Sequence, residues 1–282
     1  MKLLKVLLFT NFTFLSAVVF SQDHTMGNFE DGIYKKERSL EKEPIAYAHV
    51  READVMWSKR IWRRLDMREK MNHPIYFPNE PTNGRKSLFD VIVSGISDGT
   101  LYAFDPAYDD FRNQLTEDQA METLQRVVSK QVEDPNNPGM YFEITDTIKI
   151  ESRDVLQYQL KEDWFFDKQR SVMDVRIVGI APIVITRDED GFERGKAIPF
   201  WLYFPNCREV FANAETFNRS NDAERRTYDD IFWKRMFSSY IVKESNVYDR
   251  YIEDYASGVD ALLESDRVKE DIFNMELDMW HY

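Results

Sequence analysis

The stretch EDWFFDKQRSVMDVRIVGIAPIVITRD, residues 162–188, decides the fold class. Its first part alternates, so Trp164 and Phe166 fall on one face of a strand and Phe165 falls on the other. Trp164 and Phe166 are expected to pack in the core, whereas Phe165 fits burial and outward presentation equally well. After the turn KQRS, a run rich in Val and Ile supplies a second strand, in which Pro182 requires an edge or a bulge. The pattern predicts a strand, a turn and a second strand with apolar residues on both faces.

Period-two patterns continue on both sides of this unit, and helical patterns flank them. Strands are expected within residues 101–105, 142–150, 154–167, 173–188 and 196–204, with turns at 168–171 and 188–195. Helices are expected within residues 51–73, 87–97, 116–134, 208–217 and 227–242, and the proline-punctuated segment 72–85 is expected to be a connection. In the first of these helices Trp57, Ile61 and Leu65 recur at helical spacing, and in the third Thr116 is the expected N-cap. The order predicts an α+β fold, with a central, mainly antiparallel sheet flanked by N-terminal and C-terminal helices.

The N-terminal residues predict export. Lys2 and Lys5 precede an apolar stretch, and Ser21 offers a cleavage point, so residues 1–21 have the features of a signal peptide. Residues 22–43 are polar without a sustained period and are expected to form an extended arm, which either is disordered or lies on a neighbouring molecule. Residues 44–245 are then the α+β core domain, and residues 246–282 a helical C-terminal tail.

The charge balance limits the class of partner. The formal net charge is −13, and removal of Lys2 and Lys5 with the signal peptide makes it −15. This balance disfavours nucleic acid and anionic lipid surfaces and permits a basic protein partner. Cys207 is the only cysteine, so no intramolecular disulfide can form, which suits a bacterial periplasm. Without a second cysteine, a buried and inert thiol is expected at this position.

No motif in the sequence supports catalysis. The four histidines are scattered, and none forms a helical pair suited to zinc: His24, His49, His73 and His281. The acidic segment at Asp188 fails as an EF-hand loop, because Glu193 and Pro199 stand where a glycine and a glutamate are required. Nucleophile-elbow, phosphate-loop and dinucleotide motifs do not occur. A non-enzymatic protein without a cofactor is therefore expected; the alternatives are a periplasmic hydrolase or a small-ligand-binding protein with an unrecognised site.

Two long motifs carry a resemblance to a known family. READVMWSKRIWRRLDMREKMNHPIYFP, residues 51–78, and KEDWFFDKQRSVMDVRIVGIAP, residues 161–182, resemble the gliding motility protein N family of the Bacteroidota, called GldN, or PorN in oral relatives. The resemblance covers residues from about 44 to about 240. It implies a periplasmic, non-enzymatic component of the type IX secretion system, peripherally associated with the outer membrane through a lipoprotein, the K subunit (GldK or PorK). It also implies self-association in a ring through the K–N complex and contact with the periplasmic domain of the M subunit (GldM or PorM).

The residues that contact these partners are predicted from chemistry alone. Protein interfaces favour Trp and Arg, so the aromatic and basic residues of the two family motifs are the candidates. The predicted partner-binding residues are Trp57, Arg60, Trp62, Arg64, Trp164, Phe165 and Phe166.

Overall fold

The computed structural model of the chain describes residues 42–82, 84–133, 141–187, 193–218, 221 and 223–279. The predicted signal peptide and nearly all of the predicted arm lie outside these residues. The strands are β1 (Val55–Asp66), β2 (Ala103–Phe104), β3 (Gln125–Glu133), β4 (Tyr141–Lys149), β5 (Gln157–Asp167), β6 (Val172–Arg187), β7 (Glu193–Ala197), β8 (Trp201–Tyr203) and β9 (Tyr240–Glu244). The α-helices are α2 (His73–Tyr76), α3 (Leu88–Ser97), α4 (Glu117–Thr123), α5 (Phe204–Asn213), α6 (Tyr228–Trp233) and α7 (Val259–Met279), and short 3-10 helices span Glu52–Asp54, Ser152–Asp154 and Ile252–Asp254.

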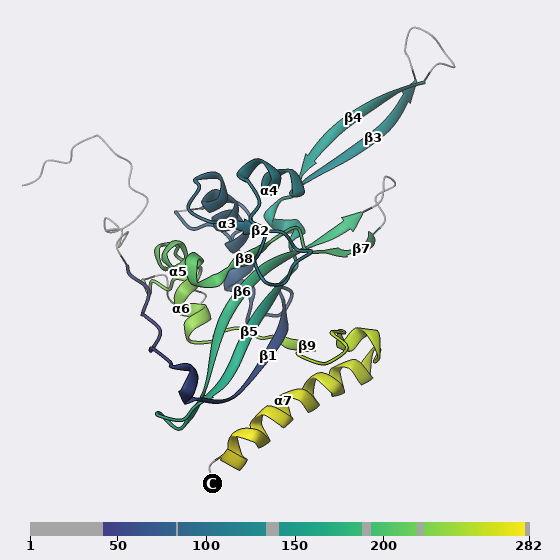
Figure 1. Cartoon of the computed structure of the whole chain (residues 1–282). Helices are drawn as coiled ribbons and strands as arrows, with labels where there is room; N and C mark the ends of the chain where they lie inside the picture. The colour runs from purple at the N-terminus through teal and green to yellow at the C-terminus, as the bar shows by residue number, and fades with distance from the viewer. Residues whose placement is uncertain are drawn as a thin grey trace, which may run out of the picture. The chain divides into compact units, whose positions relative to one another are not determined.

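A seven-stranded sheet in the order β2-β8-β6-β5-β1-β9, with β7 also paired to β6, forms the centre of the fold (Figure 1). Every pairing in it is antiparallel. Strands β3 and β4 pair with each other as a separate two-stranded sheet. The predicted α+β class, with a central, mainly antiparallel sheet, is confirmed.

The stretch of residues 162–188 lies in the long hairpin of β5 and β6, as its alternation predicted. Phe166 lies opposite Met173 and Trp164 lies opposite Val175, so the two strands are in register on either side of the KQRS turn. On the edge of β6 away from β5, Pro182 falls between the residues that pair with β8 and those that pair with β7. A proline is tolerated at such a gap in the ladder because no partner strand requires its missing N–H.

The predicted helix within residues 51–73 is wrong, because this segment forms β1. The spacing of four between Trp57, Ile61 and Leu65 is an even number, so it fits a strand as well as a helix. Strand β1 is an interior strand that pairs with β5 on one side and β9 on the other. Pairing on both edges overrides the local preference for helix.

Two other predicted helices are shorter than expected. The helix within 116–134 has the predicted N-cap, Thr116, whose side chain accepts from the Gln119 N–H, but it ends at Thr123 and β3 follows. Val127 and Val128 belong to this strand, where β-branched residues are favoured. The helix expected within 227–242 ends at Trp233. Residues 240–242, the last of the expected helix, instead begin β9.

Further expected boundaries shift by a few residues or lie outside the description. The helix expected within 208–217 begins earlier, at Phe204, and ends at Asn213. Glu193–Gly195, expected in a turn, belong to β7, while residues 188–192, the rest of that expected turn, lie outside the described residues. Helix α3 lies within the expected segment 87–97, and Gly99 after it has a φ of +67°, the left-handed conformation that ends many helices.

One face of the sheet carries the main core, covered by α3, α5 and α6. Its fully buried side chains include Leu65, Leu88, Ile92, Leu160, Phe200, Phe204, Phe211 and Tyr228. Cys207 lies in this core, where burial raises the pKa of its thiol, as an inert cysteine requires. Next to it, α7 packs on β1 and β9 through a second cluster of Ile61, Ile241, Ile252, Val268 and Ile272.

Candidate functional site

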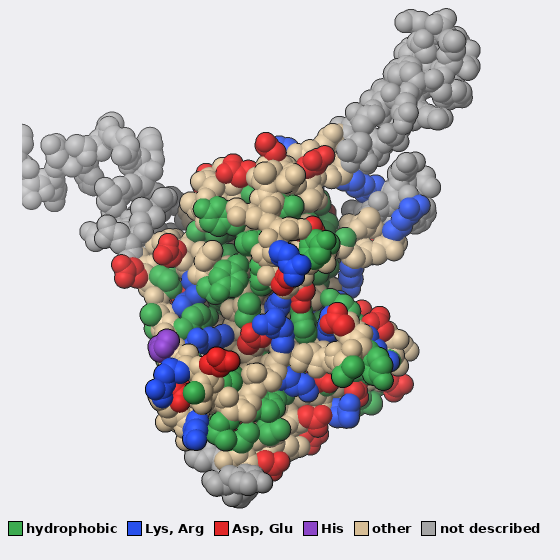
Figure 2. Space-filling model, viewed as in Figure 1, with side chains coloured by type: hydrophobic (Ala, Val, Ile, Leu, Met, Phe, Trp, Pro, Cys, Tyr) green, Lys and Arg blue, Asp and Glu red, His purple; other side chains and the backbone are tan. Residues whose placement is uncertain are grey.

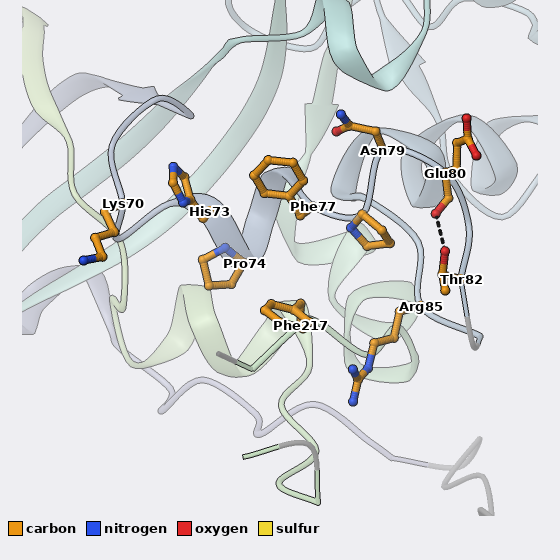
Figure 3. Close-up of a pocket in the computed structure, with 10 residues that line it drawn as sticks. Lys70, His73, Pro74, Phe77, Asn79, Glu80, Thr82, Arg85 and Phe217 are labelled. Atoms are coloured by element: carbon orange, nitrogen blue, oxygen red, sulfur yellow. Dashed lines mark hydrogen bonds between the residues drawn. The ribbon is translucent and has the colours of Figure 1, made fainter. Parts of the chain in front are cut away.

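A pocket of about 770 Å³ lies beside α2 and the connection that follows it (Figure 3). Figure 3 shows the rings of Pro74, Phe77 and Phe217 arranged around a common hollow. The residues that line it are Lys70, His73, Pro74, Phe77, Pro78, Asn79, Glu80, Thr82, Arg85 and Phe217. Its size falls within the range of small-ligand sites, and its walls are mainly apolar.

The position of the pocket is fixed by Asn72, a fully buried polar residue. Its side-chain amide donates to the carbonyls of Asp66 at 2.8 Å and Ser238 at 2.9 Å, and its side-chain oxygen accepts from the Ser238 N–H at 2.9 Å. These bonds tie the start of α2 to the end of β1 and to the segment before β9. Since a buried amide is costly without partners, Asn72 serves as a rigid anchor for the pocket wall.

The pocket has two exposed aromatic walls and a mixed charged rim. Phe77 is 40% exposed and Phe217 is 41% exposed. The Arg85 guanidinium lies 5.9 Å from the Phe217 ring centroid, a distance typical of a cation–π contact. Among the described residues, no group of three His, Cys, Asp or Glu side chains is placed to hold a metal ion. The geometry thus suits the docking of an apolar group.

A second feature is a row of alternating lysine and aromatic side chains on the other face of the sheet. Trp62 of β1 is directly opposite Lys161 of β5 and Lys243 of β9. The Lys243 amine lies 4.6 Å from the Trp62 ring and 5.0 Å from the Tyr251 ring, and it pairs with Asp249 at 2.7 Å. Both lysines are buried, which requires such contacts.

Lys161 is only 1% exposed and is held by the segment that follows β2. Its amine contacts the Asp109 carboxylate at 3.0 Å and lies 4.9 Å from the Phe111 ring centroid. Burial lowers the pKa of this amine below its ordinary value, and the contact with Asp109 opposes the effect. Lys161 thus links the sheet to the segment that carries Asp109 and Phe111.

The fold brings together the two stretches that carry the predicted partner-binding residues. Strands β1 and β5 are neighbours, with Trp57 opposite Phe166 and Arg60 opposite Asp163. Arg60 donates to Asp163 at 2.6 and 2.8 Å, so this pair bridges the two strands.

Contacts within the chain engage all seven of these residues. Trp62, Phe165 and Phe166 are buried. Trp57 and Trp164 are half-buried against the cluster under α7. As partner-binding residues, all seven stay a prediction.

Phe165, whose role the alternation left open, is 7% exposed and is covered by this chain. The Arg176 guanidinium lies 5.3 Å from its ring centroid, and Val50 and Val55 line the same hollow. Arg64, another predicted contact residue, pairs with Glu253 at 2.7 Å.

An extended strap, residues 42–50, runs from α6 to the start of β1. The Lys42 amine pairs with Asp230 at 2.5 Å. Tyr47 lies between Arg208 at 4.5 Å and Arg176 at 5.2 Å from its ring centroid, and its ring is 5.3 Å from that of Trp233. Arg176 also donates to the carbonyl of Ala48. Tyr47 is the central anchor of the strap.

Sequence reasoning missed the pocket aromatics and the exposed apolar side chains of α7. Phe77 lies in a connection, where periodicity carries no information about exposure, and Phe217 is brought to it from a distant segment. In α7 a signal was present: Val259 and Leu263, and likewise Phe273 and Leu277, are one helical turn apart, on a different side of the helix from the residues that face the core.

The comparison with family models matches residues 50–281 to the family described as gliding motility associated protein GldN. The match spans most of the chain, including both motifs that carried the resemblance. The chain belongs to the GldN family. This is a gliding motility associated family, and it is not a known family of enzymes. The comparison with curated proteins gave no match.

The helices in the described part of this GldN family member range from single turns to α7, of 21 residues. None of them combines the length and the apolar character that crossing a bilayer requires.

Proposed function

We propose that this chain is a non-enzymatic structural subunit of the type IX protein secretion and gliding motility machinery. It acts in the periplasm, where it joins the outer-membrane lipoprotein K subunit in a ring and contacts the periplasmic domain of the M subunit. The observation that carries the proposal is the GldN family match over residues 50–281. A ring of this kind gains its stability from many repeated contacts, each modest alone.

The surface of the chain supports a role in assembly. Large aromatic side chains are exposed at separate places, among them Phe77, Tyr102, Phe217 and Tyr248. Figure 2 shows apolar side chains gathered between charged ones on the face that it displays. Exposed Tyr and Phe side chains with charged neighbours are typical of protein interfaces.

The test is co-expression of the chain with the K subunit, followed by native mass measurement of the purified complex. We expect an assembly with many copies of both proteins, and loss of cargo secretion when the gene for this chain is deleted and its return on complementation. A chain that stays monomeric beside the K subunit while folded, in a deletion strain that secretes normally, would contradict the proposal.

A second candidate function is the binding of a small apolar ligand, and the pocket between Phe77 and Phe217 is the observation that favours it. Its volume of about 770 Å³ falls within the range of sites that bury a drug-sized ligand. A dye that fluoresces in apolar sites, such as ANS, tests this function. Saturable binding with one site per chain, lost in Phe217→Lys and kept in Tyr102→Lys, would support it; dye binding unchanged by Phe217→Lys would exclude it.

A further inference from the structure

Helix α7 has apolar residues on two opposite faces. Ser265, Val268 and Ile272 are buried against the sheet, and the Ser265 hydroxyl accepts from the Ile241 N–H at 2.9 Å. Val259 lies nine residues before Val268, which is two and a half helical turns and therefore the opposite side. Val259 is exposed, so the second apolar face points away from the sheet.

This second face follows a heptad pattern. Going along the helix, intervals of four and three residues alternate through Val259, Leu263, Asp266, Glu270, Phe273 and Leu277, which we call the outer stripe. Leu263 is 62% exposed and Phe273 is 59% exposed. Such a stripe is the pattern by which one helix packs against another through interlocking side chains.

Exposed aromatic side chains also lie beside the first turns of α7. The Arg250 guanidinium lies between two exposed tyrosines, 4.8 Å from the ring centroid of Tyr248 and 4.7 Å from that of Tyr255. The Tyr255 hydroxyl donates to Glu264 at 3.3 Å, which holds this tyrosine beside the first turns of α7. Tyrosine and arginine dominate the residues that contribute most to protein binding.

Charge decides what can cover the outer stripe. Between Val259 and Met279 the helix has seven acidic and two basic residues. Figure 2 shows acidic and apolar side chains next to one another where Figure 1 draws α7. Two of the acids, Asp266 and Glu270, occupy the middle of the stripe and are exposed. The nearby cation Arg267 pairs with Glu264 at 2.5 Å, away from the stripe.

A second copy of α7 does not fit this charge pattern. In a parallel pair Asp266 meets Asp266 and Glu270 meets Glu270, and in an antiparallel pair Asp266 meets Glu270. Both arrangements place acid against acid in the seam, which disfavours association. A partner helix with lysine or arginine at the two central positions fits the stripe in place of a second copy.

We propose that the outer stripe of α7 binds a basic amphipathic helix of another protein. The apolar residues of that helix pack on Val259, Leu263, Phe273 and Leu277, and its two central basic residues pair with Asp266 and Glu270. The inference rests on the assembly role proposed above and deepens it, because it names a docking surface and the chemistry of the partner.

Two synthetic helical peptides as long as α7 test the binding. In both peptides the core heptad positions are leucine except for the two central ones. These two positions are lysine in one peptide and glutamate in the other. Calorimetric titration of the purified mature chain should show binding of the lysine peptide and binding at least about tenfold weaker for the glutamate peptide. In the Asp266→Lys/Glu270→Lys variant this preference should reverse.

Exposed positions allow variants that keep the fold, which a thermal melt checks. Leu263→Lys/Phe273→Lys should abolish binding of the lysine peptide, while Asp271→Lys, on the same helix but outside the stripe, should preserve binding. Equal binding of both peptides by the natural chain, or no binding, would overturn the inference. So would a dimer of the chain that the Leu263→Lys/Phe273→Lys variant loses, because a second copy would then be the occupant.

Secretion assays separate this inference from the assembly role. If deletion of the gene leaves cargo secretion intact, the assembly role fails whatever the peptides show. If deletion blocks secretion but the Leu263→Lys/Phe273→Lys chain restores it fully without binding the lysine peptide, the docking inference fails and the assembly role stands. Loss of both peptide binding and secretion in this variant is the expected result.

Discussion

The ring of Phe111 occupies the space that a side chain at position 179 would need. A Cβ built on Gly179 lies 2.7 Å from Cζ of Phe111 and 3.2 Å from the Trp201 ring. Phe111 itself has a φ of +55°, an uncommon value for a residue with a side chain. The contact fastens the segment after β2 onto the middle of β6, beside Lys161.

Gly179→Ala should therefore displace Phe111 and destabilise the chain by about 1–3 kcal/mol, the usual effect of adding a methyl group to a filled space. Urea unfolding of Gly179→Ala, Phe111→Ala and the double variant measures the coupling. In the double variant the alanine at 179 should cost much less than it does alone, because the clashing ring is gone. Additive effects of the two changes would mean that the ring and the glycine do not constrain each other.

Asp66, at the end of β1, should make stability depend on pH in acid. Its carboxylate accepts from the Arg68 guanidinium at 2.5 Å and from the Gln157 amide at 3.0 Å. The bonds from Arg68 above all hold the pKa of Asp66 well below its ordinary value, although burial acts in the opposite direction. Because the pKa is lower in the folded chain than in the unfolded one, Asp66 stabilises the fold at pH values above its ordinary pKa of about 3.9. This stability is lost as the pH falls through the folded-state pKa.

Asp66→Asn should thus lower the free energy of unfolding at pH 7, and the difference from the natural chain should shrink below about pH 4. Denaturant unfolding of both chains between pH 7 and pH 2 measures this difference in the free energy of unfolding. The contributions of the other carboxylates cancel, because both chains contain them. Asp110→Asn is the control, since the pair of Asp110 with Arg112 is exposed on both sides and contributes little. A difference that stays constant with pH would show that the charge on Asp66 is not what stabilises the chain.

The hairpin of β5 and β6 could be predicted because its information is local. Alternation sets the faces of Trp164 and Phe166, and the KQRS segment closes the turn with Ser171 at a φ of +52°. The helix N-cap at Thr116 was local in the same way, since a side chain and an N–H three residues on suffice to form it.

The identity of β1 could not be read locally, because its charged residues find their partners far along the chain. Arg60 pairs with Asp163, more than a hundred residues away in the sequence. Lys161 would be expected at the surface, and only Asp109 and Phe111 from another segment make its burial possible. The cover of Phe165 likewise depends on Arg176 and on the strap before β1. Contacts between segments far apart in the sequence thus determine that residues 55–66 form a strand, and they determine how far the predicted contact residues are buried within this chain.

The buried ion pair of Arg208 and Asp229 should contribute far more to the free energy of unfolding than the half-exposed pair of Arg60 and Asp163. Its guanidinium and carboxylate meet at 2.8 Å with side chains 6% and 8% exposed. Asp229→Ala leaves a buried cation without its carboxylate and should cost about 3–5 kcal/mol. Asp163→Ala, which breaks the half-exposed pair with Arg60, should cost about 1 kcal/mol or less. Equal losses in urea unfolding would contradict the role given to burial.

Tyr47 should hold the strap of residues 42–50 through its ring. The ring contacts Arg208, Arg176 and Trp233, and burial raises the pKa of its hydroxyl above the ordinary value. Tyr47→Ala removes these contacts, so trypsin should cleave after Lys42 and Arg51 at least about tenfold faster, since cleavage follows the population of the open form. Tyr47→Phe keeps the ring and should digest at the natural rate. If Tyr47→Phe digests as fast as Tyr47→Ala, the hydroxyl anchors the strap instead; if neither variant changes the rate, Lys42 and the Arg176–Ala48 bond suffice to hold it.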